Sequence, residues 1–177
     1  MLFAFLQIWQ VGKQHVRNAF GAHPVWENNC VDFSPDGRFV VSGSPRLSGV
    51  RIWSMRDGSS ILLRDRDCEE ITYKAVKFSP DGKHVVASDY GGMLRLWKVR
   101  TSKLVRKWKA HQDRAFCVAF TPDGRGVVTA SYDNTLKYWD LGPLGFGDLG
   151  EVQEVLNFVG HTVRSFNVSF LYCFSCK

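Results

Sequence analysis

A histidine, a threonine and an aspartate, His111, Thr129 and Asp133, are the residues whose types could do chemistry together. A hydroxyl, an imidazole and a carboxylate are the groups of a nucleophilic triad, in which the imidazole takes the hydroxyl proton and the carboxylate orients the imidazole. However, no oxyanion-hole motif accompanies them, and each member falls at a repeated position. A structural role is the alternative that we favour: Asp133 can accept from His111, His111 can reach Thr129, and the Thr129 hydroxyl can reach the indole N–H of Trp139.

Other chemistry finds little support in the sequence. Cys173 and Cys176 form a C-x-x-C pair without a second Cys or His pair at ligand spacing, so we expect no zinc site. Five scattered cysteines favour free thiols in a reducing compartment. The sequence has no glycine-rich phosphate loop and no paired carboxylates in a plausible cleft. We expect no catalytic residues, no cofactor and no small-molecule substrate.

The charge and hydropathy patterns exclude two further classes of partner. The net charge is +6, but it is not concentrated in a basic run, so specific nucleic-acid binding is not indicated. No apolar segment is long enough to span a membrane. The short apolar start of the chain has no basic lead and no small-residue cleavage site, so we interpret it as a strand and not a signal peptide.

Two short phrases repeat along the chain and indicate the elements that position the candidate residues. Trp9, Trp53, Trp97 and Trp139 are spaced 44, 44 and 42 residues apart, and each closes an apolar–polar–apolar–Trp segment. A Phe-Ser/Thr-Pro-Asp-Gly phrase recurs at 33–37, 78–82 and 120–124. A period in the low forties is typical of a repeated four-stranded unit.

The third unit shows the expected strands most clearly. Strands are predicted at 115–120, 126–131 and 135–139, separated by turns at Pro122-Asp123-Gly124 and Asp133-Asn134. In the first of these strands, alternation predicts that Phe116, Val118 and Phe120 share one face. In the second unit, Glu69 replaces the histidine and Gly91-Gly92 replaces the Asp turn, which predicts a looser sheet.

One such sheet cannot cover both of its faces, whereas neighbouring sheets stacked around an axis can. This favours a β-propeller. The expected units are the third and fourth strands of an incomplete blade at 5–23; complete blades at 24–66, 67–110 and 111–160, the last with an inserted loop at 142–154; the first strand of a further blade at 161–170; and a divergent tail at 171–177.

The Trp-terminated third strands, the Pro-Asp-Gly turns and the Ala-His or Gly-His pairs that open the units resemble the WD-repeat family. The resemblance covers about residues 5–170. It implies an all-β fold, namely a partial WD-repeat β-propeller of three full four-stranded blades plus two incomplete ones, in a ring that is not closed. The resemblance also implies that four residues form the family's structural tetrad, a hydrogen-bonded network, namely His111, Thr129, Asp133 and Trp139. It implies that Trp9, Trp53 and Trp97 anchor their blades.

One end of the expected propeller carries residues of the types enriched in protein-binding sites. The loops that lead into the first strand of each unit and the turns between its second and third strands ring this end. We expect a protein-binding rim there, because exposed tyrosine and arginine on a rigid scaffold are typical of binding hot spots. The candidate residues are Glu27, Thr72, Tyr90, Gln112, Arg114 and Tyr132.

Longer segments resemble a particular branch of the family, the fungal Tup/Groucho-type transcriptional corepressors. The matching segments are 8–20, 57–60, 104–106, 119–126 and 135–141, the last followed by the long insertion. The resemblance implies a non-catalytic nuclear scaffold whose partners are DNA-bound transcription regulators and corepressor subunits, without direct specific contact with nucleic acid. A signalling or ubiquitin-ligase adaptor with the same repeats, and a truncated paralogue without function, stay open as alternatives.

Overall fold

The computed structural model describes residues 5–9, 16–21, 30–44, 49–65, 71–142 and 152–159, and every regular element in these ranges is a β-strand. The strands are β1 (Phe5–Trp9), β2 (Val16–Gly21), β3 (Cys30–Phe33), β4 (Phe39–Gly43), β5 (Val50–Ser54), β6 (Ser60–Leu63), β7 (Tyr73–Phe78), β8 (His84–Asp89), β9 (Met93–Lys98), β10 (Lys103–Lys109), β11 (Ala115–Phe120), β12 (Gly126–Ser131), β13 (Thr135–Asp140) and β14 (Gln153–Val159).

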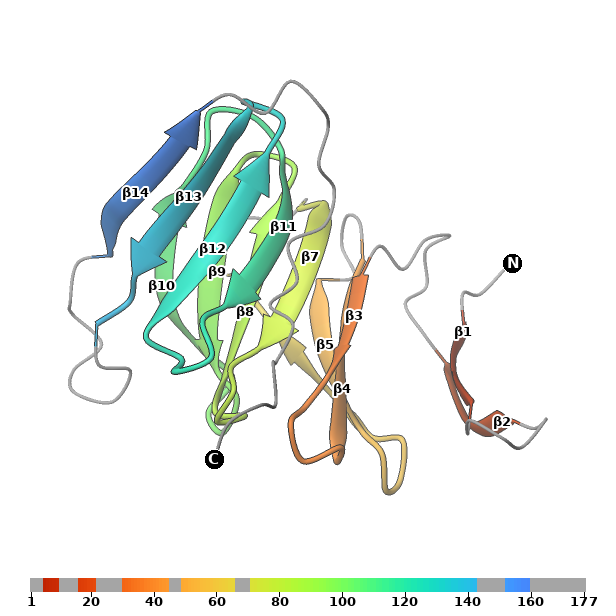
Figure 1. The fold of residues 1–177 in the computed structure, drawn as a ribbon. Coiled ribbons are helices and arrows are strands. Elements are labelled where there is room, and N and C mark those ends of the chain that lie inside the picture. The colour runs from red at the N-terminus through yellow and green to blue at the C-terminus, as the bar shows by residue number, and fades with distance from the viewer. Residues whose placement is uncertain are drawn as a thin grey trace.

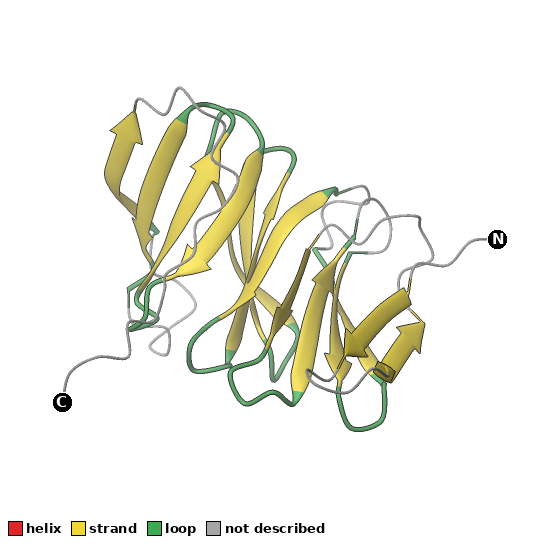
Figure 2. Cartoon of the chain, turned by 45° about the vertical axis from the view of Figure 1, so that its right-hand side comes forward, coloured by secondary structure: helices red, strands yellow, loops and turns green. Residues whose placement is uncertain are grey.

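The described strands form three four-stranded antiparallel sheets and one hairpin, each built from consecutive strands. The sheets are β3–β4–β5–β6, β7–β8–β9–β10 and β11–β12–β13–β14, and β1 pairs with β2. The sheets stand side by side in sequence order, with β7 packed against β3 and β11 packed against β7 (Figures 1 and 2). This arrangement confirms the expected all-β fold with three propeller blades in an open arc.

A tight turn joins the first two strands of each blade and has the same hydrogen bonds each time. In the second blade the Ser79 hydroxyl donates to Asp81 at 2.6 Å, and Asp81 accepts the backbone N–H of Lys83 at 3.0 Å. Gly82 follows with φ +68°, in the left-handed region that glycine adopts without steric cost. The turns at Ser34–Gly37 and Thr121–Gly124 repeat these contacts, which explains why one phrase recurs in the sequence.

The blades are held together by two apolar cores, one in each gap between neighbouring sheets. Trp97 is fully buried in the core between the first and second sheets, where it contacts Tyr73 edge to face at 6.2 Å. Trp139 lies in the core between the second and third sheets, with Trp108 of the preceding blade 6.2 Å away. Trp53 is also buried. Trp97 and Trp139 therefore each fix one blade in the stack, whereas Trp53 packs with Val40 and Met55 of its own blade. The side chain of Trp9 is outside the described residues.

Two local expectations are wrong. A β-bulge between Ala115 and Cys117 disrupts the alternation of β11, so that Phe116 leaves the face of Val118 and Phe120. Its ring instead packs on Tyr132 at one end of the sheet. Sequence alternation could not reveal this, because a bulge inserts one residue out of phase.

The inserted loop is also shorter than expected. Gln153 and Glu154 belong to β14 and pair with Asp140 and Trp139. Every residue of β14 is exposed, so this strand lacks the apolar alternation that marks a half-buried strand in a sequence.

Several predicted features fall outside the described residues. These are Glu27, Glu69, Cys173, Cys176, most of the insertion, the further strand at 161–170 and the tail at 171–177. Within the part of the chain that the structure describes, no helix combines the length and apolar character needed to cross a membrane. The same part holds no group of three or more His, Cys, Asp or Glu side chains placed to bind a metal ion.

Candidate protein-binding site

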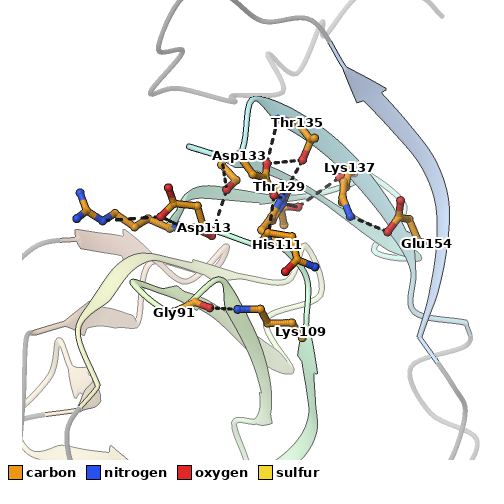
Figure 3. Close-up of polar contacts among 12 residues, drawn as sticks. Gly91, Lys109, His111, Asp113, Thr129, Asp133, Thr135, Lys137 and Glu154 are labelled. Atoms are coloured by element: carbon orange, nitrogen blue, oxygen red, sulfur yellow. Dashed lines mark hydrogen bonds and ion pairs between the residues drawn. The ribbon is translucent and has the colours of Figure 1, made fainter.

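A buried polar network runs through the third blade (Figure 3). The Trp139 indole N–H donates to the Thr129 hydroxyl at 3.0 Å. The Nε2 atom of His111 lies 2.7 Å from the same hydroxyl, and its Nδ1 atom lies 2.9 Å from the Asp133 carboxylate. Thr135 also donates to Asp133, at 2.5 Å. The three contacts expected from the sequence among His111, Thr129, Asp133 and Trp139 are therefore present.

The electrostatics of this network fix the protonation state of its histidine. Burial lowers the pKa of His111, against the opposing influence of Asp133, so the imidazole is neutral at pH 7. A neutral ring with its proton on Nδ1 donates to Asp133 and accepts the Thr129 proton at Nε2. The Thr129 hydroxyl then both donates and accepts. Each of these groups has a partner, which is the condition for keeping polar groups inside a core.

The same geometry argues against nucleophilic chemistry at this threonine. The side chains of His111 and Thr129 are both fully buried. The Thr129 hydroxyl contacts His111 on one side and the Trp139 indole on the other, so a substrate has no route to its oxygen. A nucleophile must reach the reacting atom, so the arrangement fits a brace and not a triad.

What the network braces is the turn between β12 and β13 and the loop that leads into β11. Asp133 accepts the backbone N–H of Gln112 at 3.1 Å, and Ser131 donates to the backbone carbonyl of Asp113 at 3.2 Å. The Tyr132 N–H donates to the Arg114 carbonyl at 3.1 Å. Tyr132 and Arg114 are consequently held next to each other at one end of the third blade.

The second blade achieves the same result with ion pairs. The Arg95 guanidinium contacts Asp65 at 2.7 Å and Asp89 at 2.5 Å, and Lys107 contacts Asp65 at 2.9 Å. The side chain of Arg95 is only 2% exposed. Although burial alone lowers its pKa, the hydrogen bonds to Asp65 and Asp89 raise the pKa of Arg95 above its ordinary value. Asp89 also accepts the Met93 N–H at 2.9 Å, which fixes the following turn.

These ion pairs take the place of the tetrad in the second blade, and the expectation of a looser sheet stays a prediction. Strand register places Ala87 where the third blade has Thr129, so the Trp97 indole donates to the Arg64 carbonyl at 3.3 Å instead. All six residues of β8 are buried, because this sheet lies between two others. The sequence signal for the replacement is a pair of acids, Asp65 and Asp89, that precede Arg95 by 30 and 6 residues.

Five side chains from the second and third blades meet at this end of the molecule, and we name them the rim cluster: Lys74, Tyr90, Arg114, Phe116 and Tyr132. The Arg114 guanidinium lies 4.0 Å from the ring centroid of Tyr90 and 5.8 Å from that of Tyr132. The Lys74 ammonium lies 4.9 Å from the Tyr90 centroid. Phe116 meets Tyr132 edge to face at 4.1 Å. Cation–π and aromatic contacts thus join the two blades at their surface.

An open cavity of about 420 Å³ adjoins the rim cluster. Tyr90 forms one wall and is 40% exposed, the only large rim aromatic with so much free surface in the described part of the chain. The Tyr90 N–H donates to the Thr72 carbonyl at 2.9 Å, so the wall is anchored to the loop opposite. The lining residues are Ile71, Thr72, Asp89, Tyr90, Gly91, Met93 and Arg95.

The structure brings together three of the six predicted rim residues, Tyr90, Arg114 and Tyr132. Thr72 lines the adjoining cavity, while Gln112 is exposed and contributes its backbone N–H to the brace. Glu27 is outside the described residues. Sequence reasoning missed Lys74 and Phe116. Both lie near the start of a first blade strand, at β-bulges between Tyr73 and Ala75 and between Ala115 and Cys117, which turn them toward the rim.

Comparison with known proteins agrees with this architecture. The sequence model of the family described as WD domain, G-beta repeat matches residues 14–54, 71–98 and 102–140. The chain is also similar to transcription initiation factor TFIID subunit 5 of Caenorhabditis elegans, with 30% identity over 98 residues. That alignment covers 55% of this chain and 14% of the relative, so the chain spans a small part of the relative's length.

Proposed function

The chain belongs to the WD domain, G-beta repeat family, and on that premise we propose that it is a non-catalytic scaffold that binds other proteins through the rim cluster. Proteins of this family are interaction platforms, and their function depends on surface sites and not on the propeller itself. The rim cluster is the candidate site in this chain.

One observation carries the proposal: Tyr90, which is 40% exposed, and Tyr132 lie on turns that buried polar networks hold in place, next to Arg114, whose side chain is 42% exposed. The Asp89–Arg95 pair fixes the turn of Tyr90, and the Asp133–His111 pair fixes the turn of Tyr132. A preorganised surface loses little conformational entropy on binding, which favours affinity. Tyrosine and arginine are also the residue types that dominate binding hot spots.

We place the scaffold in transcription regulation. The named relative is a transcription initiation factor subunit. The segments that resemble Tup/Groucho-type corepressors support a role in which DNA-bound regulators recruit repressive complexes. On this proposal the chain works in the nucleus and contacts transcription regulators and corepressor subunits, not a specific DNA sequence. Recruitment through protein contacts requires no basic groove.

The test is affinity purification from nuclear extract with the tagged chain and with a Tyr90→Ala/Tyr132→Ala variant. We expect transcription regulators among the bound proteins and their loss with the variant. A Lys83→Ala/Arg125→Ala variant serves as the matched control, because both residues are exposed next to the turns at the opposite end. Equal loss with both variants, or retention with both, contradicts the proposal. Capture of ubiquitin-ligase or signalling components alone supports the adaptor alternative.

A further inference from the structure

We infer that the rim cluster selects an acidic segment of its partner, whose carboxylates pair with Lys74 and Arg114 while its apolar side chains pack on Tyr90. This inference rests on the proposed function and specifies the chemistry of the partner.

The chain's own cations lie against the aromatic rings of the rim cluster. Three aromatic rings at one site are typical of pockets that hold a ligand cation. Here the chain's own cations occupy the ring of Tyr90: Arg114 lies at 4.0 Å and Lys74 at 4.9 Å from its centroid. Lys74 also lies 5.9 Å from the Phe116 centroid. A lysine or methyl-lysine from a partner meets two positive charges at this site, so a cationic ligand is disfavoured.

Three acids near the rim are already paired with other side chains. Asp65 and Asp89 are buried and paired with Arg95, and Asp65 also pairs with Lys107. Asp133 is engaged by His111 and Thr135. These carboxylates therefore do not neutralise the rim cations.

Asp113 is the one acid left near the rim among the described residues. It is 55% exposed and lies 3.9 Å from Arg114, a distance at which a surface ion pair contributes little. Lys74 has no carboxylate partner in the described ranges, and the side chain of Arg114 is 42% exposed. The described part of the rim therefore carries net positive charge, next to the 40% exposed ring of Tyr90.

The lining of the cavity fits an apolar side chain of the partner. The open cavity beside Tyr90 has Ile71 and Met93 in its lining, which suits an apolar side chain next to a carboxylate. Arg95 also lines the cavity, but it is 2% exposed and already paired with two carboxylates, so it is not the group that binds the ligand anion. Specificity for acid therefore resides in Lys74 and Arg114, and apolar contact resides in Tyr90 and the cavity wall.

The experiment measures fluorescence anisotropy of a labelled peptide rich in glutamate and phenylalanine, titrated with the full chain. Two counterpart peptides carry glutamine or trimethyl-lysine in place of glutamate. We expect the glutamate peptide to bind more tightly than both, with an affinity that falls as salt is raised, because salt screens exposed charges. Lys74→Gln/Arg114→Gln is expected to weaken binding roughly three- to tenfold, the range expected for two exposed ion pairs.

The matched control is Lys83→Gln/Arg125→Gln, which removes the same charge at the opposite end of the blades. Equal weakening by the control pair overturns the inference, because it shows attraction to net charge alone. Tighter binding of the glutamine or the trimethyl-lysine peptide also overturns it. If the Tyr90→Ala/Tyr132→Ala variant loses partners from extract while the glutamate peptide shows no preference, the proposed function stands and this inference falls.

Discussion

The most informative perturbation of the polar brace is the replacement of Thr129 by valine. Valine keeps the shape of threonine but removes the hydroxyl that joins His111 to Trp139. The indole N–H then loses its acceptor at 3.0 Å, and the Nε2 atom of His111 loses its donor at 2.7 Å. Both atoms stay buried, since Trp139 is 5% exposed and His111 is 0% exposed.

The cost follows from these two orphaned groups. An unsatisfied buried donor or acceptor costs about 1–3 kcal/mol, so we expect Thr129→Val to lower the free energy of unfolding by roughly 2–5 kcal/mol. For a chain of this size that corresponds to a fall in Tm of roughly 5–15 °C. Thr129→Ser is the matched control, because it keeps the hydroxyl and loses one buried methyl, at a cost of about 1 kcal/mol.

The assay is urea unfolding followed by tryptophan fluorescence and far-UV circular dichroism. The brace predicts that valine destabilises the chain more than serine does. If valine costs no more than about 1 kcal/mol, or less than serine, methyl packing and not hydrogen bonding explains Thr129, and the reasoning about the network is refuted.

Three further predictions follow from the same contacts. Burial lowers the pKa of His111 below 6.5, so the neutral imidazole stabilises the fold above pH 6.5. That stabilisation is lost as the pH falls toward the lowered pKa. Urea midpoints measured from neutral to mildly acidic pH should therefore fall less steeply for His111→Gln than for the unsubstituted chain. Arg95→Leu should lower the free energy of unfolding by about 3–5 kcal/mol, because it leaves Asp89 buried without its ion pair. Adding Asp89→Asn should restore part of this stability. If thermal unfolding shows no restoration, the ion pair does not explain the loss. Gly92→Ala should destabilise the chain more than Gly124→Ala, although both glycines have φ +71°. A methyl at Gly92 would lie 2.4 Å from the His111 carbonyl oxygen, whereas a methyl at Gly124 would lie an ordinary 3.7 Å from Pro80. Equal unfolding midpoints would contradict this prediction.

The sequence was sufficient to predict the blades because the signals that define them are local and repeated. Each Ser/Thr-Pro-Asp-Gly turn is closed by hydrogen bonds within a few residues, so its conformation can be predicted from those residues alone. Trp53, Trp97 and Trp139 are buried in successive blades, as their spacing predicts. The contacts of His111 follow for the same reason, since its partners occupy fixed repeat positions.

The rest of the site depends on contacts between blades that no local pattern records. Lys74 reaches the rim through a β-bulge, and its ring partners belong to its own blade and to the next one. Arg95 appears in the sequence as an ordinary polar residue of a third strand, but Asp65 lies 30 positions earlier. β14 has no apolar alternation, because both of its faces are exposed, and its pairing with β13 defines it.

We propose that the chain meets other proteins at this end of the blades and not at the buried histidine network. The most direct measurement is site-specific photo-cross-linking in nuclear extract, with benzoylphenylalanine in place of Tyr90 or, as a control, Lys83. We expect discrete cross-linked proteins at Tyr90 that position 83 does not give. The same pattern at both positions, or cross-links at Lys83 alone, would contradict it.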